Sequence, residues 1–390
     1  MKQFENIFRI LLSVVFGFLP IMTLQAQPED GNRMDSVEIS LITCSPHEEI
    51  YSLYGHSAIR YRDMVTGEDM IFNYGIFNFK KPHFALRFVF GLTDYELAIA
   101  PTQPFLDYYA HWGSQVTEQV LNLTPEEKQR IISALSINYQ PENRVYRYNI
   151  FYDNCATRPR NIIEHNLSSP LIYNPRTDFE PSFREMVGEK TKHHPWATFG
   201  NDILLGIKAD MHTSMREQHF LPENLRHDFD HAFIEHDGHQ VPFVKEHREL
   251  VAPGVQTIEE DFPLTPFQCG IILTVLSVAI LIYETVRKTT LRWFDALLML
   301  LTGLAGLVLF IMIFSQHPTT SLNLQILLLN PLSLFFIWPA WKGRRTLWFR
   351  LSTYFILAFL IGGIWQDYAE GMLFVALCLL LRNWRHYNDK

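Results

Sequence analysis

The most prominent pattern in the chain is a change from mixed polar and apolar sequence to long apolar runs after Thr265. Each run is close to 20 residues, the length that an α-helix needs to cross the roughly 30 Å hydrocarbon core of a bilayer. We therefore expect a transmembrane domain of about five helices over residues 264–384, followed by a short tail at 385–390. The runs lie at 268–286, 294–315, 321–341, 347–365 and 368–383.

Lysine and arginine occur in the first and third connections between these runs and at the C-terminal end, but not in the second and fourth connections. By the positive-inside rule, the basic connections and the C-terminus are cytoplasmic and the chain before the first run lies outside. The N-terminus agrees with this orientation, because Lys2 and Arg9, the apolar run from Ile10 to Leu24 and the small residue Ala26 are typical of a signal peptide over residues 1–26. An uncleaved anchor helix is the alternative.

Residues 27–263 form the expected exported domain, and its first half alternates apolar and polar positions as half-buried strands do. Strands are expected over 37–41, 57–62 and 70–74. A threonine, a proline and two glutamates at 124–127 predict a capping box and a helix over 125–138. The pattern over 145–167 predicts a strand, a tight polar turn and a helix. The segment 168–260 is rich in proline and histidine, and we expect helices and loops there.

The formal net charge of −8 argues against nucleic acid as a partner, since a nucleic-acid-binding surface needs clustered basic side chains. Two of the four cysteines lie in the apolar runs, so only Cys44 and Cys155 are exported. An oxidising compartment permits one disulfide between them, which is the first alternative to any catalytic interpretation.

Two polar segments at the ends of expected regular elements are the candidates for chemistry: residues 54–60 around His56 and residues 153–158 around Cys155. A cysteine at a strand-to-helix turn is placed for stabilisation of its thiolate by a helix N-terminus and a nearby imidazole. Such Cys/His pairs form thioesters with acyl donors, and a third polar group orients the imidazole. Asn73 on a neighbouring strand is the candidate for that group. Residue spacing alone leaves the Cys44–Cys155 disulfide and a buried inert thiol open.

The four segments that carry these candidates together resemble the Lnb periplasmic domain: 41–46 (LITCSP), 51–60 (YSLYGHSAIR), 72–75 (FNYG) and 153–157 (DNCAT). The multi-span C-terminal region fits the same family. The resemblance implies an α+β papain-like domain, circularly permuted as in NlpC-like and lecithin retinol acyltransferase-like proteins, attached to an all-α transmembrane bundle. It further implies a lipoprotein N-acyltransferase in the bacterial inner membrane, with Cys155 as nucleophile and His56 as base.

The mechanism expected from this resemblance moves an acyl chain from a phospholipid, through a thioester on Cys155, to the α-amine of the diacylated N-terminal cysteine of a lipoprotein. No cofactor or metal is expected. A periplasmic cysteine hydrolase and a non-enzymatic scaffold held by a Cys44–Cys155 disulfide are the alternatives. The residues expected to bind substrate are Arg60, Tyr74, Asn154 and Arg158, the two arginines as contacts for a phosphate headgroup; arginines paired with structural carboxylates are the alternative.

Nine histidines lie between His193 and His247, and His227 and His231 are one helical turn apart, a spacing able to hold zinc. No metalloprotease-type glutamate accompanies them. A solvated or interfacial histidine cluster is therefore favoured over a metal site. In the third apolar run, Asn323, Gln325 and Asn330 are expected to hydrogen-bond between helices.

Overall fold

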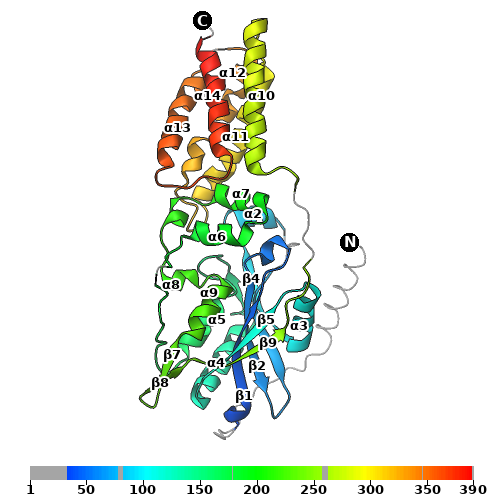
Figure 1. The fold of residues 1–390 in the computed structure, drawn as a ribbon, viewed down its shortest axis with the longest axis vertical. Helices are drawn as coiled ribbons and strands as arrows, with labels where there is room; N and C mark the ends of the chain where they lie inside the picture. Colours follow the sequence, from blue (N-terminus) through cyan, green and yellow to red (C-terminus); the bar gives the residue numbers. More distant parts are fainter. Residues whose placement is uncertain (1–32, 78–81, 178, 257–261, 345, 389–390) are drawn as a thin grey trace.

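The computed structural model describes residues 33–77, 82–177, 179–256, 262–344 and 346–388. The expected signal peptide at 1–26 lies outside these residues. Figure 1 shows an elongated molecule in which a domain of sheet and helices stands at one end and a bundle of helices at the other. The α+β character expected for residues 27–263 is confirmed for the described part of that segment.

A seven-stranded antiparallel sheet forms the framework of the first domain. Its order is β6-β4-β3-β2-β1-β5-β9, so the strand that begins at His56 lies near the middle. The strands are β1 (Val37–Cys44), β2 (His56–Asp63), β3 (Asp69–Ile76), β4 (Asp94–Pro101), β5 (Val116–Leu121), β6 (Val145–Arg147) and β9 (Val244–Val251).

Strand β1 is buried on both faces, and its alternating side chains enter two different cores. Ile39 and Leu41 pack in the larger core with α4 (Pro125–Tyr139), α5 (Thr157–His165) and α9 (Pro222–Asp230). Ile42 and Cys44 pack on the other face, against α3 (Thr102–His111). The period of two along one strand therefore separates the two layers that cover the sheet.

Local sequence signals predicted several of these elements correctly. The capping box at the start of α4 is formed, because the Thr124 side chain accepts from the Glu127 N–H and the Glu127 side chain accepts from the Thr124 N–H. The expected strands at 57–62 and 70–74 correspond to β2 and β3.

The expectation of helices and loops alone over 168–260 is wrong, because the chain there also forms three strands. β7 (Phe233–His236) and β8 (His239–Pro242) make a hairpin, and β9 joins the edge of the main sheet beside β5. The other elements of the domain are η1 (Met34–Ser36), η2 (Ile50–Ser52), α2 (Phe84–Val89), α6 (Phe183–Thr191), α7 (Pro195–Leu204), η3 (Ile207–Asp210) and α8 (Met215–Gln218).

The second part of the chain is helical, with α10 (Pro266–Arg287), α11 (Arg292–Ile313), η4 (Leu324–Leu327), α12 (Ser333–Trp341), α13 (Trp348–Gly362) and α14 (Met372–Asn388). Within the described residues, α10 and α11 are the helices long and apolar enough to cross a membrane, and α13 is a shorter apolar helix. The expectation of one helix over 321–341 is wrong: the short turn η4 and the nine-residue α12 replace it, with Pro331 between them.

Two of the three polar residues of this third run contact the first domain, whereas the Asn330 side chain accepts from the backbone N–H of Leu332 at 3.0 Å. Asn323 donates to the Ile203 carbonyl at 2.7 Å and Gln325 to the Asp202 carbonyl at 2.7 Å, both at the C-terminal end of α7. Gln366 donates to the Leu205 carbonyl at 3.1 Å. These amides satisfy carbonyls that the end of a helix leaves without partners, and they fasten the two parts of the molecule together.

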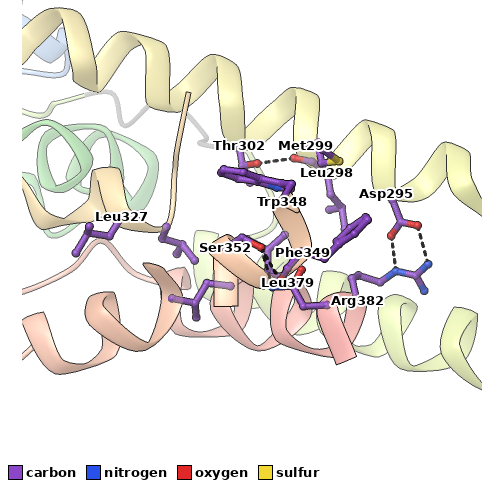
Figure 2. A pocket seen from close by; sticks show the side chains of 13 residues that line it. Asp295, Leu298, Met299, Thr302, Leu327, Trp348, Phe349, Ser352, Leu379 and Arg382 are labelled. Carbon is purple, nitrogen blue, oxygen red and sulfur yellow. Dashed lines mark hydrogen bonds and ion pairs between the residues drawn. The ribbon is translucent and has the colours of Figure 1, made fainter. Parts of the chain in front are cut away.

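The interior of the bundle is closely packed. Arg382 is buried and pairs with Glu284 and Asp295, each at 2.7 Å, so that charges from α10, α11 and α14 neutralise one another. Figure 2 shows the Asp295–Arg382 pair at the edge of a cavity of about 20 Å³. A space of this size holds about one water molecule and is too small for an acyl chain.

Candidate active site

His56 and Cys155 meet where the start of β2 faces the turn before α5. His56 follows Gly55, whose positive φ of 76° is readily adopted only by a residue without a side chain. The β2–β3 ladder runs from Ile59↔Phe72 to Arg62↔Asp69, so the first residues of β2 extend beyond it. This extension leaves that side of His56 and Ser57 free to face the cysteine.

A second turn holds Cys155 in place. The Asn154 side-chain oxygen accepts from the backbone N–H of Ala156 and of Thr157, both at 2.9 Å, and the Thr157 hydroxyl accepts from the Asn154 N–H at 2.8 Å. Asn154 also donates to the carbonyls of Ile150 and Phe220. The Asn154 side chain thus caps the turn that holds Cys155, and α5 begins at Thr157.

Asn73 on β3 orients the imidazole, since the His56 Nε2 lies 2.7 Å from the Asn73 side-chain oxygen. An amide oxygen can only accept, so Nε2 carries the proton and Nδ1 is left for the sulfur of Cys155. Burial lowers the pKa of His56, but the negative charge of Cys155 and its hydrogen bonds with Cys155 and Asn73 outweigh this and raise it.

The pKa of Cys155 is lowered, although burial alone raises it. The charge and hydrogen bond of His56 favour the thiolate, as do the backbone N–H groups of Ser57 and of Cys155 itself. The Cys155 sulfur, which is 9% exposed as part of the whole residue, thus has three groups that favour its charged form: the imidazole of His56 and these two N–H groups.

Cys44 differs sharply from Cys155. It lies opposite His56 in the β1–β2 register, but burial raises its pKa far above the ordinary value, despite a hydrogen bond with Tyr109. Both cysteines are free thiols. No disulfide joins Cys44 and Cys155 in this structure, and Cys155 is the candidate nucleophile because its pKa is the one that is lowered.

Aromatic residues that the sequence analysis did not single out surround this pair. The Tyr109 ring stacks beside His56 with centroids 6.4 Å apart, and Phe105 lies 6.5 Å from the same imidazole. Tyr95 and Tyr148 stack on each other at 4.0 Å. Burial raises the pKa of Tyr95 to about 12 and also raises the pKa of Tyr148, and the negative charge of Cys155 adds to both shifts.

Gly75 closes the site on the β3 side. A Cβ at this position would lie 3.6 Å from the Cys155 Cβ and 4.0 Å from the His56 Cε1, and the residue has a φ of 96°. Gly75 could have been identified as a site residue from the sequence, because it directly follows Asn73 and Tyr74 in the 72–75 segment.

The four residues expected to bind substrate have other partners. Arg60 is buried between Asp69, at 2.5 Å, and Glu118, at 3.0 Å. The buried Tyr74 donates to Asn138 at 2.6 Å, and Asn154 caps the turn described above. Arg158 pairs with Asp153 at 2.6 Å but keeps 23% of its side chain exposed. The first three contacts are structural, and only Arg158 retains a surface for a ligand.

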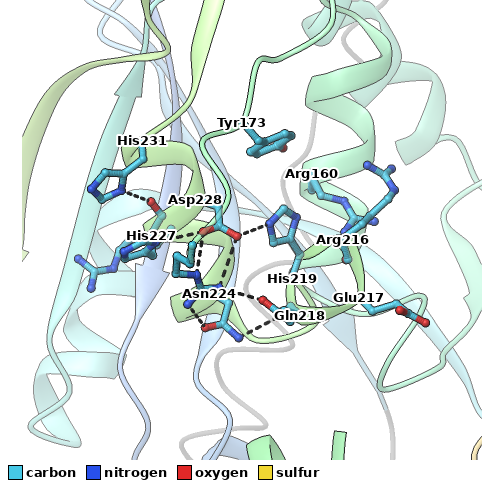
Figure 3. A network of polar contacts seen from close by, with 12 residues as sticks. Arg160, Tyr173, Arg216, Glu217, Gln218, His219, Asn224, His227, Asp228 and His231 are labelled. Carbon is cyan, nitrogen blue, oxygen red and sulfur yellow. Dashed lines mark hydrogen bonds and ion pairs between the residues drawn. The ribbon is translucent and has the colours of Figure 1, made fainter. Parts of the chain in front are cut away.

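The histidine-rich segment forms hydrogen bonds around one carboxylate (Figure 3). Asp228 accepts from His219 at 2.8 Å and from His227 at 3.0 Å, and it pairs with Arg176 at 3.2 Å. His231 bonds to the His227 carbonyl. The described residues contain no group of three or more His, Cys, Asp or Glu side chains arranged to hold a metal ion.

The fold and the comparisons define a membrane protein that carries a periplasmic α/β domain on a transmembrane region. Residues 25–185 match the family model of the Lnb N-terminal periplasmic domain, and residues 257–389 match that of the Lnb transmembrane domain. The chain belongs to the Lnb family. No curated protein and no solved structure matches it significantly. Family membership is consistent with a membrane enzyme of lipoprotein maturation.

Proposed function

We propose that this protein is a lipoprotein N-acyltransferase that uses Cys155 as its nucleophile. One observation carries the proposal: Cys155, whose pKa is lowered, faces His56, which is hydrogen-bonded to Asn73, in a chain that has the periplasmic and transmembrane domains of the Lnb family. The three residues have the roles of nucleophile, base and orienting group that cysteine acyl transfer requires.

In the first half-reaction, the Cys155 thiolate attacks the ester carbonyl of a phospholipid. The C–S bond forms, the C–O bond breaks, and the leaving alkoxide takes the Nδ1 proton of the His56 imidazolium. The products are a lysophospholipid and an S-acyl enzyme. The N–H groups of Ser57 and Cys155 stabilise the oxyanion of the intermediate.

In the second half-reaction, the free α-amine of a diacylglyceryl-modified N-terminal cysteine attacks the thioester. His56 accepts the proton that the amine loses, the C–S bond breaks, and the thiolate is restored beside the imidazolium. The product is an amide, so the lipoprotein gains its third acyl chain and the enzyme returns to its starting protonation state.

Exclusion of water favours transfer over hydrolysis at this site. Cys155 is 9% exposed, and the rings of Phe105 and Tyr109 lie beside its partner His56. A thioester enclosed in this way is shielded from bulk water, which a hydrolase must admit. The transmembrane region keeps the site at the surface where both lipid substrates lie, which raises their effective concentration.

The same proposal includes the fold of the periplasmic domain, the topology of the chain in the membrane and a contact for the donor phosphate. A histidine on the sheet that precedes a cysteine at a helix start supports a circularly permuted papain-like domain. The distribution of basic residues supports an inner-membrane protein with a cytoplasmic C-terminus and about five spans. Arg158 is the candidate for contact with the donor phosphate, because it combines positive charge with partial exposure.

The test is mass spectrometry of a lipoprotein's N-terminal peptide from cells that depend on this protein for N-acylation. Cys155→Ala should abolish the N-linked acyl chain and leave the diacylglyceryl group in place. Cys44→Ala, the matched control for the other buried thiol, should retain the N-linked chain. Unchanged N-acylation in a correctly inserted Cys155→Ala protein would show that the assignment is wrong.

A further inference from the structure

Helix α2 and the turn after it expose three large apolar side chains within five residues. Leu86 is 55% exposed, Phe88 45% and Phe90 36%. Arg87, between them, pairs with Asp94 at 2.6 Å. Clustered exposed apolar groups of this size mark a surface that contacts an apolar partner.

The contacts of α2 with the transmembrane region fix its position relative to the bilayer. Gln316 donates its backbone N–H to the Phe90 carbonyl at 3.0 Å, and His317 Nε2 donates to the Phe88 carbonyl at 2.8 Å. Both donors follow directly after α11, a 22-residue apolar helix. Such a helix is about 33 Å long, close to the thickness of the hydrocarbon core, so its end marks the boundary of the bilayer.

Helix α7 also indicates where the boundary of the bilayer lies. The Trp196 indole N–H donates to the carbonyl of Leu264, immediately before α10, and the Trp196 ring packs beside Phe199 at 5.5 Å. Tryptophan is enriched at the membrane–water interface. Figure 1 shows α2 and α7 together at the end of the periplasmic domain next to the bundle.

Aromatic side chains lie on the strand that the chain enters after α2. The chain leaves α2 and enters β4, on which Tyr95 packs against Phe77 at 4.8 Å and against Tyr148 at 4.0 Å. β4 pairs with the end of β3 at Ile76↔Glu96, directly after Gly75, where an added Cβ would lie 3.6 Å from the Cys155 Cβ. The aromatic residues of β4 therefore follow α2 in the chain and lie on the strand beside the one that borders Cys155.

We propose that residues 86–90 insert into the periplasmic leaflet of the membrane and form the entrance through which a phospholipid acyl chain reaches Cys155. The insertion depends only on the exposure of these side chains and on their continuity with the transmembrane region. The entrance role rests on the proposed acyltransferase function, and the two parts have separate tests.

Photo-crosslinking tests insertion in the full chain in native membranes, with a benzophenone amino acid placed at position 86 or 88. Both positions should give phospholipid adducts, as should position 310, an exposed site on α11. Position 137 is an equally exposed apolar site on α4, a helix that Figure 1 shows toward the end of the domain away from the bundle, and it should give none. Adducts at 310 without adducts at 86 and 88 would refute insertion, whether or not the protein is an acyltransferase.

The entrance role is tested by S-acylation of Cys155 in Leu86→Glu/Phe88→Glu protein. Acylation from phosphatidylethanolamine vesicles should fall roughly tenfold or more, since two carboxylates oppose burial in lipid. Acylation by a soluble butyrate ester should stay within about twofold, because this donor does not enter from the bilayer. Equal losses with both donors would overturn the entrance role. Absence of S-acyl Cys155 in the wild-type protein would instead refute the proposed function and leave the crosslinking result intact.

Discussion

The Asn201 side-chain amide donates a hydrogen bond of 2.9 Å to the hydroxyl of Tyr54, and this contact joins the membrane junction to the segment that carries His56. Asn201 lies on α7, whose C-terminal carbonyls are held by Asn323 and Gln325 of the transmembrane region. Tyr54 is two residues before His56. A chain of hydrogen bonds thus leads from the transmembrane region to the segment before His56, and we expect it to help position the proposed base.

Asn201→Ala should slow S-acylation of Cys155 by a few-fold. Loss of one hydrogen bond removes about 1 kcal/mol, and 1.4 kcal/mol corresponds to a tenfold change in rate. Single-turnover acylation from phospholipid vesicles measures the effect. Asn122→Ala is the control: it removes an exposed hydrogen bond from the Asn122 side-chain amide to the Pro242 carbonyl and should leave the rate unchanged. Equal rates in the two variants would show that α7 does not position His56.

The rate of S-acylation of Cys155 should rise with pH on an acid limb and fall on an alkaline limb. The thiolate persists above the lowered pKa of Cys155, and the imidazolium persists below the raised pKa of His56, so activity is greatest between the two values. Asn73→Ala removes a hydrogen bond that raises the pKa of His56, and the alkaline limb should therefore move to lower pH. The rate of S-acylation of Cys155 from phospholipid vesicles, followed by peptide mass spectrometry across the pH range, measures both limbs, because this reaction needs the thiolate as nucleophile and the imidazolium as proton donor. An alkaline limb at the same pH in both proteins would contradict the role given to Asn73.

Gly75→Ala should reduce both stability and activity. An alanine at a positive φ costs about 1–2 kcal/mol, and its methyl group would contact the Cys155 Cβ at 3.6 Å, where the acyl group must form. Gly67→Ala is the matched control, because Gly67 also has a positive φ but has no atom within 4 Å of the added Cβ. Both variants should unfold at lower denaturant concentration, and only Gly75→Ala should lose S-acylation. Comparable acylation in the two proteins would place Gly75 outside the site.

Arg60→Gln should destabilise the fold by about 3 kcal/mol without changing the affinity for phospholipid. The substitution leaves Glu118, with 1% of its side chain exposed, without its closest positive partner. Arg62→Gln on the same strand is the control: Arg62 is 43% exposed and 3.9 Å from Glu38, so its loss should cost less than about 1 kcal/mol. Denaturant unfolding and the phospholipid dependence of acylation separate the two roles. A raised requirement for phospholipid in stable Arg60→Gln protein would restore Arg60 as a substrate contact.

The sequence by itself determined the features that depend on neighbouring residues. The capping box of α4, the strands that carry His56 and Asn73, and the apolar helices α10 and α11 follow from spacing, turn chemistry and hydrophobic length. The four family motifs also singled out the two candidate segments, around His56 and Cys155, that the structure brings together.

Only the tertiary structure decided which of these residues meet. Sheet order brings the start of β2 against the turn before α5, and this meeting explains why Cys155 has a lowered pKa whereas the pKa of Cys44 is raised. The amides of Asn323 and Gln325 have the pattern of interhelical contacts, yet their partners lie on α7, more than 100 residues away. Spacing along the chain carries no information about such distant partners, because sheet order and domain docking determine which buried groups share one environment.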